Sequence, residues 1–343
     1  MTQPALDKFI RRGFLLKAEA TEGTDSTPVP ATDGVLLMEG AIATQYDKVE
    51  RKTDRPVFGG FPFAVANKRV AISASFELYP PTAPGTAGAP GLADCAKILL
   101  PCGMAEVRDS VGKTTIYNPI STGIPSATMY GYHAGTLCKS LGTRGNISGL
   151  TMKIGDRFMG KMDMLGTYVT YDEVALPTNI VVPTKVPVVA RWSNTTCKTS
   201  ATDGTSKGSS TAAGALTDLH LRAKSLALDF GNAVTHKEYT EYQANQINDR
   251  LPKWTLLIAK SDMTNDFNPW FIRDNGTLIS LEFELFETDI AVGASNSTAL
   301  FVQGQIEDIQ EVDTDGDYTW QITGTAIPTS AGNDEFLIKF KGV

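Results

Sequence analysis

The sequence predicts a mainly β protein, a β-sandwich or barrel with one or two short helices. The first observation is an alternation of apolar and polar side chains with a period of two, which is typical of half-buried strands. Over residues 69–79 it places Val70 and Ile72 on one face and Ser73 and Ser75 on the other. Threonine and β-branched residues are frequent, as sheets prefer, and helical signals are few.

The same patterns predict strands along most of the chain. Residues 277–287 alternate clearly, with Ile279 and Leu281 on the opposite face from Glu282 and Glu284. Further strands are expected at residues 35–44, 127–133, 147–154, 158–170, 219–230, 253–260, 300–312 and 318–326. The dipeptide Asp315-Gly316 lies between the last two of these and predicts a hairpin turn.

Two short helices are expected. Residues 91–103 place Cys95, Leu99 and Cys102 at helical spacing, with Gly103 as a C-terminal stop. Residues 262–274 form the second candidate, with Asp262 as its N-cap and a proline inside the segment.

Three loop segments divide the chain. Residues 80–90 form a Pro/Gly connection, residues 176–189 repeat proline as an extended linker does, and residues 193–218 form a Ser/Thr/Gly/Ala tract. In both halves the predicted order of elements is a strand, a long polar connection, a strand, a short helix and more strands. This shared order is consistent with an internal duplication. The predicted division is an N-terminal arm (1–34), a first β domain (35–175), a linker and loop (176–218) and a second β domain (219–343).

Composition excludes several functional classes. The formal net charge is −7, whereas a nucleic-acid reader needs a basic face to neutralise phosphates. No apolar run approaches the length of a transmembrane helix, and the N-terminus lacks the apolar core of a signal peptide, so we expect no membrane association and no Sec export. The four cysteines include no C-x-x-C pair and are expected to be free thiols in a reducing cytosol.

No motif supports catalysis or metal binding. Residues 204–208 fit G-x-S-x-G but lie in the low-complexity tract, without the strand-to-helix turn that this motif needs. Residues 112–114 resemble the end of a phosphate loop that lacks its first glycine. Residues 313–317 lack the glycine and glutamate positions of a calcium loop, and the histidines are scattered. We therefore expect no enzyme activity, no cofactor and no metal.

Five stretches share their order and turn chemistry with one known family. Residues 15–37 begin LLKAEATEGTDSTPVP, and residues 127–168 contain an aromatic-rich strand, a G-x-R-G motif and a glycine-closed hairpin. The others are residues 225–239 (SLALDFGNAVTHKEY), 248–252 (NDRLP) and 312–340. Together they resemble the tail tube, or major tail, proteins of long-tailed, siphovirus-type bacteriophages. The tract at 193–218 has no counterpart in that pattern.

The resemblance implies a structural virion protein rather than an enzyme. Members of that family form rings whose inner strands join across subunits into a continuous β-barrel, and the rings stack into a hollow tail tube. Phage DNA passes through the tube during ejection without specific binding. The implied partners are further copies of the chain, a tape measure protein in the lumen, and tail terminator and distal tail proteins at the ends. Assembly would take place in the host bacterial cytoplasm.

The resemblance also assigns candidate contact residues. The arm at residues 15–37 and the polar connection at residues 45–62 would bridge one ring to the next. The inter-ring candidates are Lys17, Glu19, Thr21, Asp47, Lys48, Glu50 and Arg51. A polar, net-negative wall would repel phosphates and let DNA slide. The candidates for this lumen face are Ser73, Ser75, Glu77, Glu282 and Glu284.

The number of chains per ring and the functional class are both left open. If the two halves are duplicated tube domains, three chains complete a pseudo-sixfold ring, and otherwise six are needed. The alternative function is a β-sandwich virion decoration protein, adhesin or carbohydrate-binding module, which would be a monomer or small oligomer with an exposed aromatic patch. The four tryptophans, Trp192, Trp254, Trp270 and Trp320, are dispersed in the sequence. A contractile or secretion-system tube protein is a close cousin of the leading hypothesis.

Overall fold

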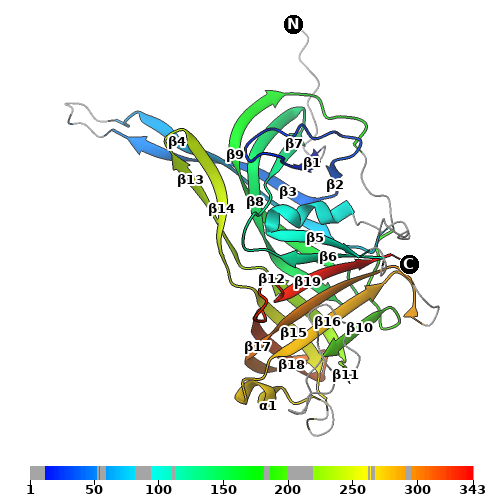
Figure 1. Cartoon of the computed structure of the whole chain (residues 1–343). Coiled ribbons are helices and arrows are strands. Elements are labelled where there is room, and N and C mark those ends of the chain that lie inside the picture. Colours follow the sequence, from blue (N-terminus) through cyan, green and yellow to red (C-terminus); the bar gives the residue numbers. More distant parts are fainter. Residues whose placement is uncertain are drawn as a thin grey trace.

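The computed structural model describes most of the chain (Figure 1). The described residues are 12–51, 54, 59–81, 94–109, 113–180, 186–199, 219–261, 263, 267–290 and 295–342. Several sequence features therefore lie outside the described residues: most of the connection at 80–90, the tract at 200–218 with its G-x-S-x-G pattern, Gly112 and the expected N-cap Asp262.

Strands dominate the described structure, which confirms the expected mainly β class. The strands of the first half are β1 (Arg12–Ala18), β2 (Gly34–Val35), β3 (Met38–Glu50), β4 (Phe63–Glu77), β5 (Met104–Asp109), β6 (Thr114–Pro119), β7 (Ala127–His133), β8 (Thr136–Lys153) and β9 (Met159–Glu173). Those of the second half are β10 (Thr195–Thr199), β11 (Leu219–His220), β12 (Ala223–Asp229), β13 (Asn232–Tyr239), β14 (Tyr242–Arg250), β15 (Lys253–Ala259), β16 (Ile279–Phe286), β17 (Ser297–Thr314), β18 (Asp317–Ala326) and β19 (Phe336–Lys341).

The helical segments are shorter than expected. The helix predicted at 91–103 is instead two 3-10 turns, η1 (Asp94–Ile98) and η2 (Leu100–Cys102), because a proline follows Leu100 and Gly103 ends the segment with φ of 86°. The helix predicted at 262–274 begins only at Pro269. Helix α1 (Pro269–Asp274) has Asn268 as its N-cap, which accepts a hydrogen bond from the Phe271 amide.

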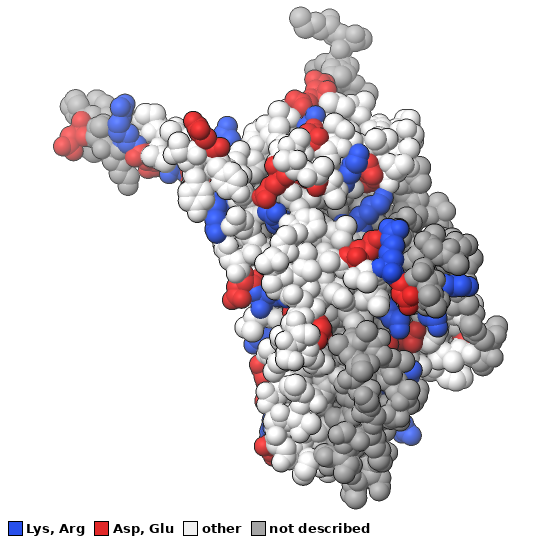
Figure 2. Space-filling model, viewed as in Figure 1, with Lys and Arg blue, Asp and Glu red and all other residues white. Residues whose placement is uncertain are grey.

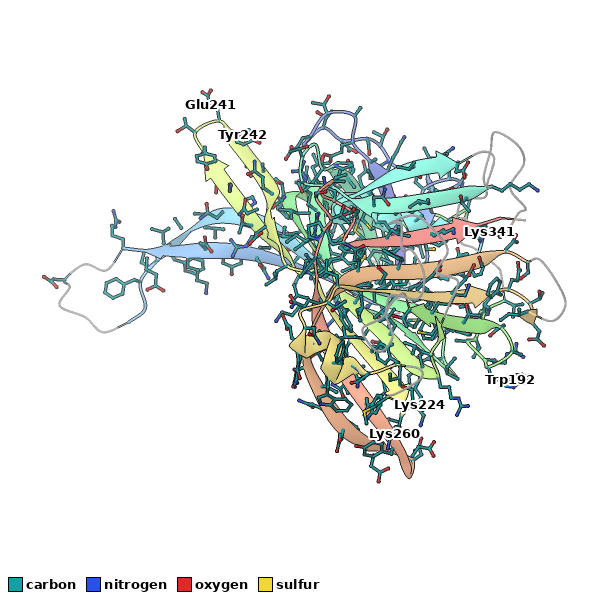
Figure 3. All side chains as sticks on the ribbon, turned by 60° about the horizontal axis from the view of Figure 1, so that its bottom comes forward. Trp192, Lys224, Glu241, Tyr242, Lys260 and Lys341 are labelled. Atoms are coloured by element: carbon teal, nitrogen blue, oxygen red, sulfur yellow. The ribbon has the colours of Figure 1, made fainter. Side chains whose placement is uncertain are left out.

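Both segments that were predicted to be polar connections are mainly β-hairpins instead. Residues 45–50 continue β3 outward and residues 63–68 begin β4, so most of the expected connection at 45–62 is a β-hairpin. The expected connection before residue 253 is the hairpin β13–β14. In Figures 1 and 3 both hairpins extend beyond the body of the molecule, on the same side. Their polar side chains suit strands that lie outside the core.

The two halves of the chain repeat one set of antiparallel strand pairs. In the first half, β1 pairs with β2 and β7, β7 with β8, β8 with β9, β9 with β4, and β4 with β3. In the second half, β10 pairs with β11 and β16, β16 with β17, β17 with β18, β18 with β15, and β15 with β12. By this pattern β10, which lies inside the expected linker, belongs with the second half.

An edge-to-edge strand pair joins the halves. Residues 225–228 of β12 pair with residues 150–153 of β8, and the Phe230 amide donates to the Ile147 carbonyl at 3.0 Å. The result is a continuous row in the order β3, β4, β9, β8, β12, β15, β18, β17. Strand β19 also ties the halves together, because it pairs with both β17 and β6.

One cluster of buried apolar side chains runs through both halves. It includes Phe76 on β4, Trp254 on β15 and Trp320 on β18, each of which is at most 1% exposed. Trp270 of α1 packs edge-on against Trp320, with ring centroids 5.0 Å apart. Each such side chain contributes about 1.5–3 kcal/mol of burial free energy, so the row is held against the remaining strands by its apolar face.

Candidate assembly site

The second face of the row is polar in both halves. On β4, Ser73 lies opposite Asp163 and Ser75 lies opposite Lys161 of β9. On β15, Thr255 lies opposite Thr323 of β18. The charged residues that the strand registers place on this face include Arg69, Lys153, Lys161, Lys253, Asp163, Asp229 and Asp308. Charges of both signs are likewise interspersed over the surface seen in Figure 2. The face offers small hydroxyl groups and balanced charge rather than a cationic patch.

The lumen candidates fall into two groups. Ser73 and Ser75 lie on the polar face, half-buried. Glu77 ends the same strand but is buried, and its pKa is raised by that burial although the Arg157 guanidinium lies 3.3 Å away. Glu77 is therefore covered within its own chain, with the Arg157 guanidinium against it, and does not lie open on the polar face.

Glu282 and Glu284 lie on β16, which is not part of the row. Glu282 is buried opposite Phe301, and Glu284 accepts a hydrogen bond of 2.6 Å from Ser297. The structure does not bring these two glutamates onto the face that carries Ser73. Alternation placed them correctly on one side of a strand, but it could not show which sheet the strand joins.

The row ends in two open strand edges. Among the described residues, β3 pairs only with β4, and residues 305–314 of β17 pair only with β18. An open edge presents unsatisfied backbone N–H and C=O groups, which readily pair with another strand. The open part of β17 is acidic, with Glu307, Asp308, Glu311 and Asp313 in ten residues.

The N-terminal inter-ring candidates differ in their surroundings. Lys17 and Thr21 are exposed. Glu19 is fully engaged inside the chain: its carboxylate accepts hydrogen bonds from Ser126 at 2.6 Å, from Thr128 at 3.0 Å and from the Gly142 amide at 2.9 Å. Glu19 therefore anchors the loop after β1 to β7 and β8.

The other inter-ring candidates lie on the projecting hairpin β3–β4. Asp47, Lys48, Glu50 and Arg51 are all exposed. A hydrogen bond of 2.7 Å from Asn67 lowers the pKa of the Asp47 carboxyl, and Arg69 at 3.4 Å adds to this. These side chains are available for contacts with another molecule.

A buried polar cluster holds hairpin β13–β14 in place. The sequence analysis did not predict this cluster. Arg144 of β8 donates to Glu22 at 2.7 and 3.0 Å and to the carbonyl of Ile124 at 2.9 Å. It also donates to the Asn245 carbonyl on β14, and the Asn245 amide in turn donates to the Gly142 carbonyl at 3.0 Å. The G-x-R-G motif was the available signal, but nothing in the sequence identified its distant partners.

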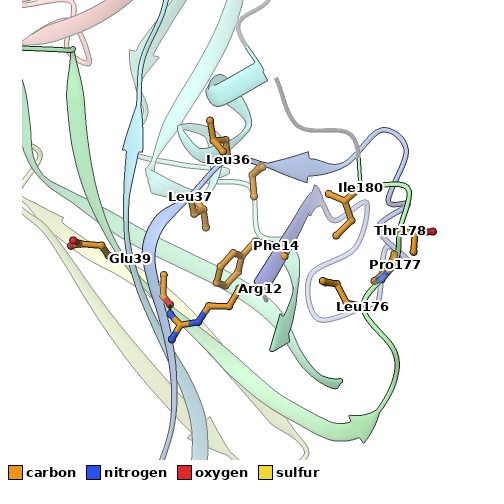
Figure 4. Close-up of a pocket in the computed structure, with 12 residues that line it drawn as sticks. Arg12, Phe14, Leu36, Leu37, Glu39, Leu176, Pro177, Thr178 and Ile180 are labelled. Atoms are coloured by element: carbon orange, nitrogen blue, oxygen red, sulfur yellow. Dashed lines mark hydrogen bonds between the residues drawn. The ribbon is translucent and has the colours of Figure 1, made fainter. Parts of the chain in front are cut away.

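A cavity lies beside the start of β3 (Figure 4). Its volume is about 780 Å³. Its walls are mainly apolar, from Phe14, Leu36, Leu176 and Ile180, and the Arg12 guanidinium at its edge donates to the Gly40 carbonyl. The polar side chains among the lining residues are those of Arg12, Glu39 and Thr178.

Three further kinds of side chain could support chemistry or ligand binding: cysteines, metal-ligating groups and tryptophans. All four cysteines are free and buried, and burial raises the pKa of Cys197 to about 12, so its thiol is neutral near pH 7. In the described residues no group of three or more His, Cys, Asp or Glu side chains could hold a metal ion. Trp192 is 89% exposed, but Trp254 and Trp320 are buried, so the tryptophans form no surface patch.

The described part of the chain contains no helix that is both long and apolar enough to cross a membrane. Comparison with known proteins found no family model and no curated protein that matches this chain.

Proposed function

We propose that this chain is the subunit of a hollow tube of the kind built by tail tube proteins of siphovirus-type phages. One observation carries the proposal. Two sets of four strands with the same pairing stand side by side, joined by the β8–β12 edge pair, and the row that they form ends in two open edges. The two units of one chain pair edge to edge, so the same two edges can also pair between units of different chains. Repeated head-to-tail addition of this kind closes a ring if its rotation closes.

The strand directions permit closure. Every neighbouring pair in the row is antiparallel, so the first strand, β3, and the eighth, β17, run in opposite directions. Pairing β17 of one copy with β3 of the next continues the alternation without a break. Three copies give a pseudo-sixfold barrel of 24 strands. At a spacing of about 4.8 Å and a tilt of about 40°, its backbone diameter is about 48 Å, wide enough for a DNA duplex.

The polar face suits the wall of a DNA conduit. If it faces the lumen, the wall carries Ser73, Ser75, Thr255 and Thr323 among charges of both signs. Such a wall offers no cluster of cations to hold phosphates, and the whole chain is net negative. DNA would pass without a binding site to stop it. This assignment keeps Ser73 and Ser75 as lumen residues and leaves out the glutamates of β16.

Electron microscopy of the purified chain over a concentration series tests the proposal. We expect end-on views of rings with a central hole, and stacked rings at high concentration. The series should be repeated at high salt, which screens repulsion from the acidic edge of β17. A single monomeric species under all of these conditions would contradict the proposal and favour the decoration or binding-module alternative.

A further inference from the structure

The two projecting hairpins occupy equivalent places in the repeat but differ in burial. The middle of hairpin β13–β14 is packed against the first half of the chain, where Ala244 and Asn245 are 1% and 0% exposed, whereas Tyr239 and Tyr242 at its tip are 63% and 50% exposed. Hairpin β3–β4 carries Tyr46, Phe63 and Val65, which are 44%, 48% and 42% exposed. The unit that precedes β13–β14 lies in the same chain. The described residues contain no unit in the equivalent place for β3–β4.

The packed hairpin uses the face that continues the apolar side of β12. On this face, Asn245 donates to the Gly142 carbonyl of β8 at 3.0 Å, and His236 lies 2.9 Å from the Asn245 side-chain oxygen. At the base, the Asn232 amide group donates to the Cys102 and Gly145 carbonyls at 2.7 and 3.1 Å. The hairpin therefore rests on the bend of β8 and on the end of η2.

On the bare hairpin, the corresponding face carries large exposed side chains together with two charged residues. Counting outward from Ile42 on the core side of β3, alternation brings Tyr46 and Lys48 to the same side, and Val65 lies opposite Lys48. Phe63 follows on that side, and the Lys48 ammonium lies 4.8 Å from its ring centroid. The opposite face carries Asp47 and Val49 with Ala64 and Ala66. Glu50 lies opposite Phe63 and shares the side of Tyr46 and Lys48. We name the set Tyr46, Lys48, Glu50, Phe63 and Val65 the clasp face.

The second half has a counterpart of the surface on which β13–β14 rests. The irregular pairing of β8 at residues 141–144 corresponds to that of β17 at residues 306–308. Gly103 after η2 corresponds to Gly276 after α1, and both have positive φ. In this second surface, Leu278 is 46% exposed and Glu307 and Asp308 are exposed. No part of the described chain is packed over it as β13–β14 is packed over β8.

We propose that the clasp face docks on this surface of a neighbouring copy in the same ring. Val65 and Phe63 then cover Leu278, and Lys48 approaches the acidic bend of β17, where Glu307 already pairs with Lys253 at 3.9 Å and Asp308 belongs to the polar face. The inference rests on the proposed head-to-tail ring. It changes the assignment of Lys48 from a contact between rings to a contact within one ring. It also explains why a two-stranded hairpin that exposes Tyr46, Phe63 and Val65 extends from the monomer.

Cross-linking between two single-cysteine variants tests the contact. Val65→Cys is mixed with Leu278→Cys, and Val49→Cys on the opposite face of the hairpin replaces Val65→Cys in the matched control. The native cysteines are buried, so a short bismaleimide reaches the introduced thiols. We expect cross-linked dimers from the Val65 mixture at a yield at least about tenfold above the Val49 mixture.

Assembly of charged variants gives a second measurement. Val65→Asp should raise the concentration needed for half-maximal ring formation by about tenfold or more, because a carboxylate would be buried beside Glu307 and Asp308. Val49→Asp should change it by less than about twofold. Both positions are exposed in the monomer, so neither substitution affects folding directly.

The outcomes separate the clasp from the tube. Suppose that rings are seen in the electron microscope but Val65→Cys cross-links to Leu278→Cys no more than Val49→Cys does. The proposed docking of the clasp face is then wrong, and the tube proposal is unaffected. Specific Val65–Leu278 cross-links in particles without a central hole support the clasp and overturn the tube. Absence of association in every mixture overturns both.

Discussion

At the scale of single residues, Arg144 shows how one buried cation can organise distant segments. Its side chain, 10% exposed, joins the loop after β1 through Glu22 to the hairpin β13–β14 through the Asn245 carbonyl. Removing the guanidinium would leave a carboxylate and two carbonyls without their donor. Such groups are costly when they are shielded from water.

Arg144→Met should therefore lower the free energy of unfolding by about 3 kcal/mol, measured by urea denaturation. Arg108→Met is the matched control, because Arg108 is 49% exposed and its ion pair with Glu106 should contribute at most about 1 kcal/mol. Equal losses from the two variants would show that the Arg144 cluster has no special role in stability.

Glu77 gives a prediction about pH. Burial raises the pKa of its carboxyl above the usual 4.5, so the folded state holds the proton more tightly than the unfolded state. The free energy of unfolding should therefore fall as pH rises from about 4.5 through the folded-state pKa. Glu77→Gln should remove this part of the decline. Below pH 4.5 the free energies of unfolding of the two proteins should differ only by a constant amount. Parallel stability curves over the whole pH range would contradict the assignment.

At the scale of elements, the bend of β17 against β18 depends on close backbone approach. A Cβ at Gly324 would lie 2.2 Å from the Gln305 carbonyl oxygen and 2.4 Å from the Trp254 ring. Neither a backbone carbonyl nor a buried indole can easily move aside. Gly324→Ala should therefore destabilise the fold by about 3 kcal/mol in chemical denaturation.

Gly60 provides the control for that substitution, because nothing lies within 4 Å of a Cβ built there. Gly60→Ala should change the free energy of unfolding by less than about 0.5 kcal/mol. A small effect at both positions would mean that the strands separate enough to admit a methyl group.

The acidic edge of β17 gives a second prediction at this scale. Ala43 is exposed on β3, the strand proposed to pair with this edge in the next copy. Ala43→Glu should weaken assembly through like-charge repulsion, and Ala43→Lys should not. The difference should shrink as salt rises, since ions screen exposed charges. Sedimentation velocity over a salt series measures it, and identical behaviour of the two variants would argue against pairing of these edges.

At the scale of the whole molecule, the duplicated strand pairing predicts the number of chains per ring. Each chain supplies two units, so a pseudo-sixfold ring needs three chains. Native mass spectrometry of single rings should give three copies. Rings of six copies would mean that each chain contributes only one unit to the symmetry, and the repeated strand pairs would then need another explanation.

Much of the element content could be predicted from the sequence. β7 matches its expected bounds, and the turn at Asp315-Gly316 lies where the dipeptide placed it. Hairpin β13–β14 was missed because its turn at Thr240-Glu241 lacks glycine, asparagine and aspartate, and Glu241 takes a positive φ of 62° instead. Two partners of Arg144, Glu22 and Asn245, lie 122 and 101 residues away, so no local pattern could reveal them.

The sequence by itself determined the β class, most strand positions and the alternation that gives the row one apolar and one polar face. These follow from side-chain chemistry repeated at the period of a strand. Only the tertiary structure decided which strands pair, that β8 and β12 join the halves, that β16 lies outside the row, and that one hairpin is covered while its counterpart is bare. Such facts depend on hydrogen bonds and packing between segments far apart in the chain, which local periodicity does not encode.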